Sequence, residues 1–162
     1  MPVKEFIRNR PLIANIVYSL RPFTWRPSPV NIQVILKNLA QRRKNLFFVQ
    51  IGSNDGLNGD PIYKLIRDFR WTGIMVEPLP EICARLKSNY QGVPGLTFEN
   101  SAISAKIGKT PFYTLSEVNG HNSSQMSSLL FEVIAKQKLV MPDFAERFVV
   151  RYVNSITVTD LL

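Results

Sequence analysis

The fold is decided by Phe47-Phe48-Val49-Gln50-Ile51-Gly52-Ser53-Asn54-Asp55-Gly56. The first half of this stretch is almost wholly apolar, which predicts a buried β-strand over residues 46–51, and the second half is a polar turn bounded by glycines. A second apolar segment, residues 73–78, ends on the carboxylate of Glu77 and the ring of Pro78. A glycine turn after one strand and an acid at the tip of the next is how α/β proteins hold a nucleoside. The two segments therefore predict a nucleoside-cofactor site.

The residues around these segments alternate between strand and helix patterns. We expect strands over residues 46–51, 74–77 and 96–99, with helices that begin at Asp60-Pro61 and at Pro80 between them. This order with short connections predicts an α/β fold with a parallel sheet and right-handed crossovers. The pattern then changes to an extra strand over 110–115, a polar loop over 116–128, a helix over 128–139 and β-branched residues over 148–158.

Length and composition indicate a globular domain. The chain has 162 residues, 45% of them apolar, which is enough to bury a core. Its single cysteine, Cys83, excludes an internal disulfide and fits a reducing compartment such as the cytoplasm. The longest apolar stretch near the start, residues 12–20, is too short and too polar to span a bilayer.

The net charge of +8 is concentrated at the start of the chain. Residues 1–45 hold nine basic side chains and one acid, whereas residues 46–162 hold eleven of each sign. We therefore divide the chain into a basic, helical N-terminal extension over 1–45 and a domain over 46–162. The extension is either a solvated basic face or a segment that docks peripherally on an anionic membrane or an acidic partner. Nucleic acid is the least favoured partner, because aromatic residues are not regularly interleaved with the charges.

The polar turn favours a particular class of ligand. Gly52 and Gly56 allow a sharp turn and close approach of a ligand, and the helix that follows presents N–H groups to an anion. Ser53, Asn54 and Asp55 lie between the glycines. An aspartate here would repel a pyrophosphate but suits an ammonium group, and Asn54 occupies the position of a glycine in the dinucleotide fingerprint.

Glu77 indicates that the ligand also contains a ribose, because a carboxylate at a strand tip can accept hydrogen bonds from both hydroxyls of a ribose. A ligand that combines ribose, ammonium and carboxylate groups is S-adenosylmethionine. The residues thus point to this cofactor rather than to a dinucleotide.

Four segments, FVQIGSNDG, DPIYKLI, WTGIMVEPLPEICARLKSNY and LTFENSAIS, resemble the FkbM family of S-adenosylmethionine-dependent methyltransferases over roughly residues 46–115. The resemblance implies a Rossmann-like class I methyltransferase fold and methyl transfer to hydroxyl oxygens of sugars or small natural products. It also implies a cofactor site in which Gly52, Ser53, Asp55 and Gly56 line the methionine end, Glu77 holds the ribose, and Ser101 and Ala102 lie against the adenine.

The residues that would perform catalysis are not identified by the sequence, and no metal is expected. The only histidine, His121, is interpreted as a solvated residue of the polar loop, and Cys83 as a core residue on an apolar helix face. The acceptor is expected to be a small molecule or a glycan.

The end of the chain leads to a further expectation. The family pattern continues past the final TDLL segment into an acidic strand, whereas this sequence stops at Leu162. In the expected strand order three-two-one, residues 46–51 would form a sheet edge, for which their apolar sequence is unusual. The simplest interpretation is the N-terminal part of a larger, here incomplete, methyltransferase domain. Such a chain would bind the cofactor weakly or not at all, aggregate readily and lack turnover.

Two other functions remain open. A fragment of an NAD-dependent oxidoreductase would bind NAD in preference to S-adenosylhomocysteine. A non-catalytic scaffold that docks through residues 1–45 would bind anionic vesicles in a salt-sensitive manner and ignore both cofactors.

Overall fold

The computed structural model describes residues 31–116, 126–139 and 141–162. The chain divides into two compact units, residues 1–35 and 36–162. Of the first unit, residues 31–35 are described, and they begin helix α3 (Ile32–Arg42). The Asn31 side chain accepts hydrogen bonds from the N–H groups of Gln33 and Val34 (3.0 and 3.4 Å) and thus forms the N-cap of this helix. Of the basic, helical extension expected over residues 1–45, residues 1–30 lie outside the described residues.

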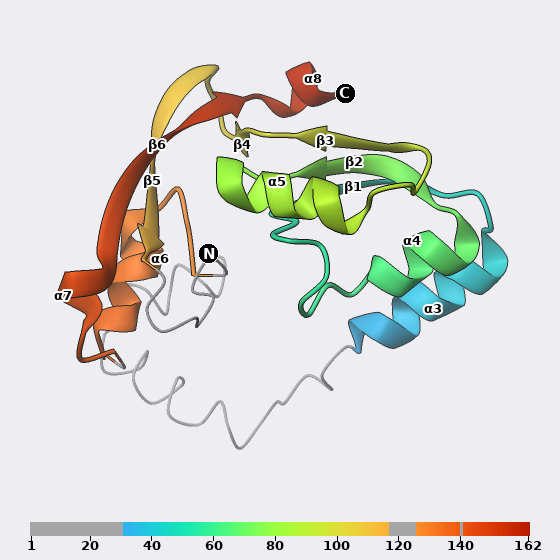
Figure 1. Ribbon diagram of the computed structural model, residues 1–162, viewed down its shortest axis with the longest axis horizontal. Coiled ribbons are helices and arrows are strands. Elements are labelled where there is room, and N and C mark those ends of the chain that lie inside the picture. Colours follow the sequence, from blue (N-terminus) through green and yellow to red (C-terminus); the bar gives the residue numbers. More distant parts are fainter. Residues whose placement is uncertain (1–30, 117–125, 140) are drawn as a thin grey trace, which may run out of the picture. The chain divides into compact units, whose positions relative to one another are not determined.

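The second unit contains a parallel sheet of three strands in the order β1-β2-β3 (Figure 1). The strands are β1 (Phe47–Ile51), β2 (Thr72–Val76) and β3 (Leu96–Glu99), and they are connected by helices α4 (Tyr63–Phe69) and α5 (Pro80–Asn89). The predicted β-α-β-α-β alternation and strand order are confirmed. The unit also takes in residues 36–45, which the charge pattern had assigned to the extension, because Ala40 is fully buried in its core.

One face of this sheet carries the helices. Met75 packs with Ile66 of α4 and Leu86 of α5 in a single apolar cluster, and α4 and α5 lie on the same side of the sheet in Figure 1. On the opposite face, Phe47 and Ile51 are 61% and 59% exposed. The apolar sequence of β1 indicated cover on both faces. Within the described residues this expectation is wrong, since β1 is an edge strand with one covered face.

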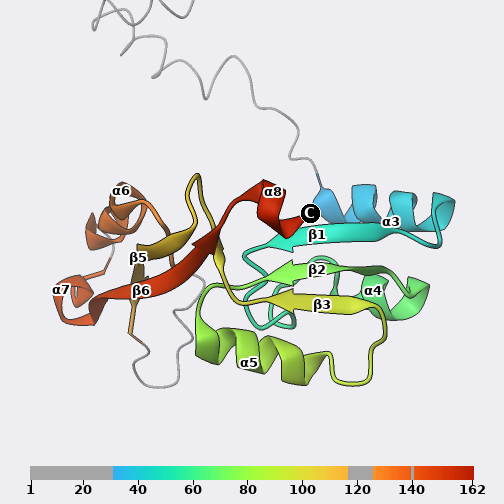
Figure 2. The same cartoon turned by 90° about the horizontal axis from the view of Figure 1, so that it is seen from above.

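A second, mixed sheet follows, in the order β4-β6-β5 (Figure 2). It consists of β4 (Ala102–Ile103), β5 (Gly108–Leu115) and β6 (Phe148–Ile156); β5 runs antiparallel to β6, and β4 runs parallel to it. The remaining elements are α6 (Phe131–Ala135), the 3-10 helix η1 (Lys136–Leu139), α7 (Phe144–Arg147) and α8 (Val158–Leu161). None of the helices in the described part of the chain combines the length and the apolar character needed to cross a membrane.

Two helix starts differ from the sequence prediction. Helix α4 begins at Tyr63 rather than at Asp60-Pro61. The Asp60 carboxylate forms a local turn, in which its Oδ1 atom accepts hydrogen bonds from the Ile62 N–H and the Gln50 side chain (2.8 and 3.3 Å). The last helix is capped by Thr157 in a reciprocal capping box, whereas the final Thr159-Asp160-Leu161-Leu162 sequence predicts a cap two residues later, at Thr159.

Candidate functional site

The polar turn after β1 forms as predicted. The N–H groups of Gly52 and Ser53 both donate to the Val76 carbonyl (2.9 and 3.0 Å), which ties the turn to the end of β2. The backbone adopts positive φ angles at Gly52 (76°), Asn54 (50°) and Gly56 (67°). Glycine adopts this conformation without strain, and asparagine is among the other residues that tolerate it best.

Asp55 is used within the turn itself. Its Oδ1 atom accepts from the N–H groups of Leu57 and Asn58 (3.0 Å each), and its Oδ2 atom accepts from the Asn58 side chain (2.6 Å). Burial works to raise the pKa of Asp55, but these hydrogen bonds outweigh burial and lower that pKa below its ordinary value of 3.8. Asp55 therefore stabilises the loop, and its contact with a ligand stays a prediction.

Gly56 lies against helix α5. A Cβ atom at this position would lie 2.5 Å from both Leu86 Cδ1 and Tyr90 Cε2. The Tyr90 hydroxyl donates to the Gly56 carbonyl (3.0 Å), and the Asn89 amide donates to the Asp55 carbonyl (2.9 Å). Gly56 thus permits close packing of the turn on α5, and it lines none of the cavities described below.

Glu77 lies at the tip of β2 and is only 6% exposed. Its carboxylate accepts hydrogen bonds from the N–H groups of Asn54 and Leu79 (3.0 Å each). Burial raises the pKa of Glu77, and the two hydrogen bonds offset part of this shift. An ionised carboxylate offers about four acceptor positions, so this one keeps the capacity to accept hydroxyl groups.

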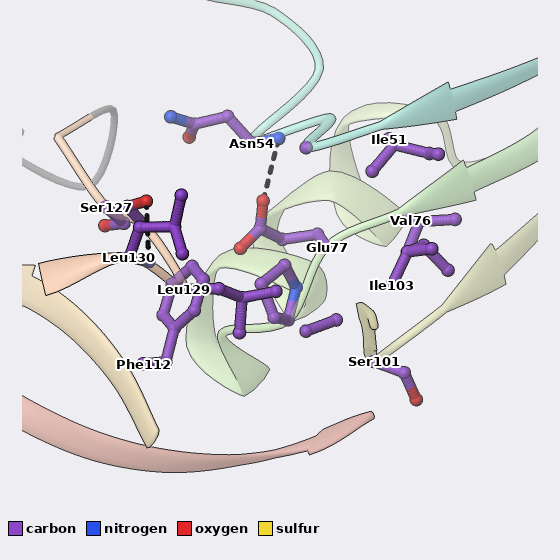
Figure 3. Close-up of a pocket in the computed structure, with 14 residues that line it drawn as sticks. Ile51, Asn54, Val76, Glu77, Ser101, Ile103, Phe112, Ser127, Leu129 and Leu130 are labelled. Carbon is purple, nitrogen blue, oxygen red and sulfur yellow. Dashed lines mark hydrogen bonds between the residues drawn. The ribbon is translucent and has the colours of Figure 1, made fainter. Parts of the chain in front are cut away.

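Glu77 lines a cavity of about 510 Å³ (Figure 3). The cavity brings together five of the predicted site residues, namely Gly52, Asn54, Glu77, Ser101 and Ala102. Figure 3 shows the hydrogen bond from Asn54 to the Glu77 carboxylate, with the other lining side chains around it. The volume is within the range typical of small-molecule sites.

Several lining residues were missed by sequence reasoning. Phe112 of β5, Leu129 and Leu130 supply an apolar wall of the cavity, and Ser127 and Ser128 line it beside them. They were missed because they belong to the second sheet and to the loop before α6. No local sequence pattern indicates that these segments lie close to the end of β2. Asn100 was missed as well; its side chain donates to the carbonyls of Glu77 and Pro78 (2.8 and 3.2 Å) and fixes the strand tip. An amide directly after a predicted strand was the only available signal.

A smaller cavity of about 240 Å³ adjoins the same turn. It shares Gly52 and Asn54 with the main cavity and also includes Ser53. Two further lining residues, Gln50 and Asp60, carry buried acceptor atoms (Oε1 and Oδ2) without a hydrogen-bond partner in the described part of the chain. Burial and the nearby Asp55 charge raise the pKa of Asp60. The cavity therefore suits a group that brings N–H donors and positive charge.

The other chemistry-bearing residues lie elsewhere. Cys83 is buried on helix α5, as expected of a core residue. His121 lies outside the described residues. Across residues 31–116, 126–139 and 141–162, no group of three or more His, Cys, Asp or Glu side chains is arranged to hold a metal ion.

Comparison with models of protein families gave no match, and neither did comparison with curated proteins or with solved structures. The resemblance to the FkbM family therefore stays a prediction that rests on the residues of this chain.

Proposed function

We propose that this chain binds S-adenosylmethionine and serves the transfer of its methyl group to a hydroxyl oxygen of a sugar or another small acceptor. The observation that carries the proposal is the buried Glu77 carboxylate, held by the Asn54 N–H at the wall of the main cavity. The predicted turn and the predicted acid converge on one site, and that convergence is what a nucleoside cofactor requires.

The main cavity fits the adenosine part of the cofactor. Glu77 retains acceptor capacity for the two ribose hydroxyls. The apolar side chains of Ile103, Phe112 and Leu129 offer surfaces against which a flat base can pack. Ala102, which was predicted to lie against the adenine, lines the same cavity.

The smaller cavity fits the amino-acid end. It shares Gly52 with the main cavity, and the space beside this residue is open, since an added Cβ atom would meet nothing within 4 Å. The carboxylate of Asp60 and the side-chain oxygen of Gln50 match an ammonium group in charge and hydrogen bonding. A linear ligand with ribose at one end and ammonium at the other would then pass the turn at its glycine.

The cofactor, when bound, supplies a methyl group on a positively charged sulfur. The residues of the chain would orient it, and an acceptor hydroxyl must be aligned with the methyl group and lose its proton. Among the described residues that line the main cavity, Glu77 is the only one with an ionisable side chain, and the proposal assigns it to the ribose.

The proposal is tested by NMR titration of the labelled full chain with S-adenosylhomocysteine, adenosine and 2′,3′-dideoxyadenosine. We expect S-adenosylhomocysteine to bind weakly, with Kd on the order of 1 mM. Removal of both hydroxyls should weaken adenosine binding about tenfold, because hydrogen bonds to a charged acceptor are lost. In the Glu77→Gln variant, the difference in Kd between adenosine and 2′,3′-dideoxyadenosine should be smaller than in the wild type.

Glu146→Gln removes an exposed carboxylate on α7 and serves as the matched control, in which the tenfold difference persists. Equal binding of adenosine and the dideoxy compound by the wild-type chain would refute the assignment of Glu77. Binding of NAD together with no response to S-adenosylhomocysteine would favour the oxidoreductase alternative.

A further inference from the structure

The described residues form a third cavity, of about 630 Å³, between helix α5 and the β5-β6 ribbon. None of its lining residues lines either cavity of the candidate site. Thr114 of β5 pairs with Val149 of β6, and both side chains face the cavity together with Arg151, two residues further along β6. The cavity is therefore a separate feature that the proposed function leaves unused.

The floor of this cavity is apolar. Leu79, Ile82 and Leu115 each expose 3% or less of their surface, yet all three line the empty volume together with Val149. Apolar walls around a space of this size match the general character of small-molecule sites. They favour an occupant with an apolar body.

The rim of the cavity carries three charged side chains. Glu81 and Arg85 lie one helical turn apart on α5, and Arg151 of β6 forms an ion pair with Glu81. Burial works to raise the pKa of Glu81, but the hydrogen bond from Arg151 and the charge of Arg85 outweigh it and lower that pKa. Among the described residues that line this cavity, the charged groups are two guanidinium groups and one carboxylate, whose charges sum to +1.

We propose that this cavity binds a small amphipathic monoanion whose carboxylate contacts Arg85 and Arg151 and whose apolar body packs on Leu79, Ile82 and Val149. The planar fork of a guanidinium group matches a carboxylate in geometry and charge. A dianion such as a phosphate monoester is disfavoured, because the charges of the described lining residues sum to +1 and Glu81 would repel it.

The test is an NMR titration of the labelled full chain with octanoate, which has an anionic head and an apolar body. Octan-1-ol lacks the charge, acetate lacks the body, and octyl phosphate carries the larger charge. We expect octanoate to bind with Kd on the order of 1 mM and to shift resonances of α5 and β6, and each of the other three compounds to bind more weakly.

Variants assign the binding to the rim. Arg85→Gln and Arg151→Gln should each weaken octanoate binding about tenfold. Glu81→Gln should strengthen it severalfold, because the repelling carboxylate is removed and Arg151 is released from its ion pair. Lys87→Gln removes the same charge from an exposed position on α5 that does not line the cavity, and it should leave binding unchanged.

The proposal is overturned if octanoate produces no shifts, if octan-1-ol binds as tightly as octanoate, or if Arg85→Gln behaves like Lys87→Gln. Arg85 is exposed, so its substitution is not expected to disturb folding. Because the titration contains no adenosyl compound, its outcome is independent of whether the chain binds S-adenosylmethionine.

Discussion

At the scale of single residues, the two glycines of the turn have different roles. Both have positive φ angles, yet an added Cβ atom at Gly52 meets nothing within 4 Å, whereas at Gly56 it meets Leu86 and Tyr90 at 2.5 Å. The sequence presents them as an equivalent pair of ligand-approach positions. In the structure, Gly52 lines two cavities, whereas Gly56 packs against the end of helix α5.

Substitution by alanine should separate these roles. Gly56→Ala should lower the free energy of unfolding by about 2–5 kcal/mol, because a left-handed backbone strain of about 1–2 kcal/mol adds to overpacking of about 1–3 kcal/mol. Gly52→Ala should cost only the backbone part, about 1–2 kcal/mol. Urea unfolding at neutral pH measures both values. Equal losses for the two variants would contradict the packing role of Gly56.

At the scale of elements, helix α5 holds the turn in place through its last residues. Asn89 and Tyr90 donate to the carbonyls of Asp55 and Gly56, and Tyr90 is 2% exposed. Burial, aided by the negative charge of Asp60, raises the pKa of Tyr90 well above its ordinary value of 10.0. The neutral phenol is therefore the form that the folded chain requires.

This linkage predicts an alkaline loss of stability. The pKa of Tyr90 is higher in the folded chain than in the unfolded chain. Its contribution to the free energy of unfolding is therefore fully present below pH 10, and it is lost as the pH rises from 10 toward the pKa of the folded chain. Tyr90→Phe should cost about 1–3 kcal/mol at pH 7, since the buried Gly56 carbonyl loses its donor. The difference between wild type and variant should narrow above pH 10.

Urea unfolding at pH 7 and at pH 10.5 measures this difference. Tyr152→Phe is the matched control, because that ring is 71% exposed. A constant gap between the wild type and Tyr90→Phe across the two pH values would show that Tyr90 does not carry the alkaline loss.

The elements also show which parts of the fold could be predicted from the sequence. The first sheet was predictable, because apolar runs such as residues 47–51 and the periodic face of α5 are local signals. In the second sheet, the strand expected over 110–115 and the β-branched stretch over 148–158 correspond to β5 and β6. Strand β4 and the strand pairing were not predictable, since β4 has only two residues and pairs with Ser155 and Ile156, more than fifty positions away. For the same reason Glu77 could be identified as a site residue, whereas Phe112 on the opposite wall could not.

At the scale of the whole described unit, the edge strand β1 exposes apolar side chains on one face of the first sheet. Phe47, Val49 and Ile51 of the edge strand β1 are 61%, 38% and 59% exposed. An apolar edge without charge or proline is a template for pairing with another chain. The expectation of ready aggregation is thus linked to a defined surface.

Polar substitution of this face should reduce self-association. Phe47→Thr and Ile51→Thr keep β-propensity and remove exposed apolar area, so they should lower association in sedimentation velocity experiments and change the free energy of unfolding by less than about 1 kcal/mol. Leu139→Thr alters another exposed apolar side chain, one at 87%, outside the sheet. If it reduces association as much as the β1 substitutions do, the β1 face is not the responsible surface.

The main cavity has walls from both sheets, with Glu77 following β2 and Phe112 belonging to β5. A ligand in it would contact residues of both sheets at once. At a ligand concentration of one hundred times Kd, the free energy needed for a local opening that separates these walls would rise by about 2.7 kcal/mol. Amide hydrogen exchange would then slow in β5 and β6 as well as at the turn, while openings that leave the cavity intact would keep their rates. Occupancy of the site would add a ligand-dependent connection between the two sheets to the apolar contacts that already link helix α5 to the second sheet.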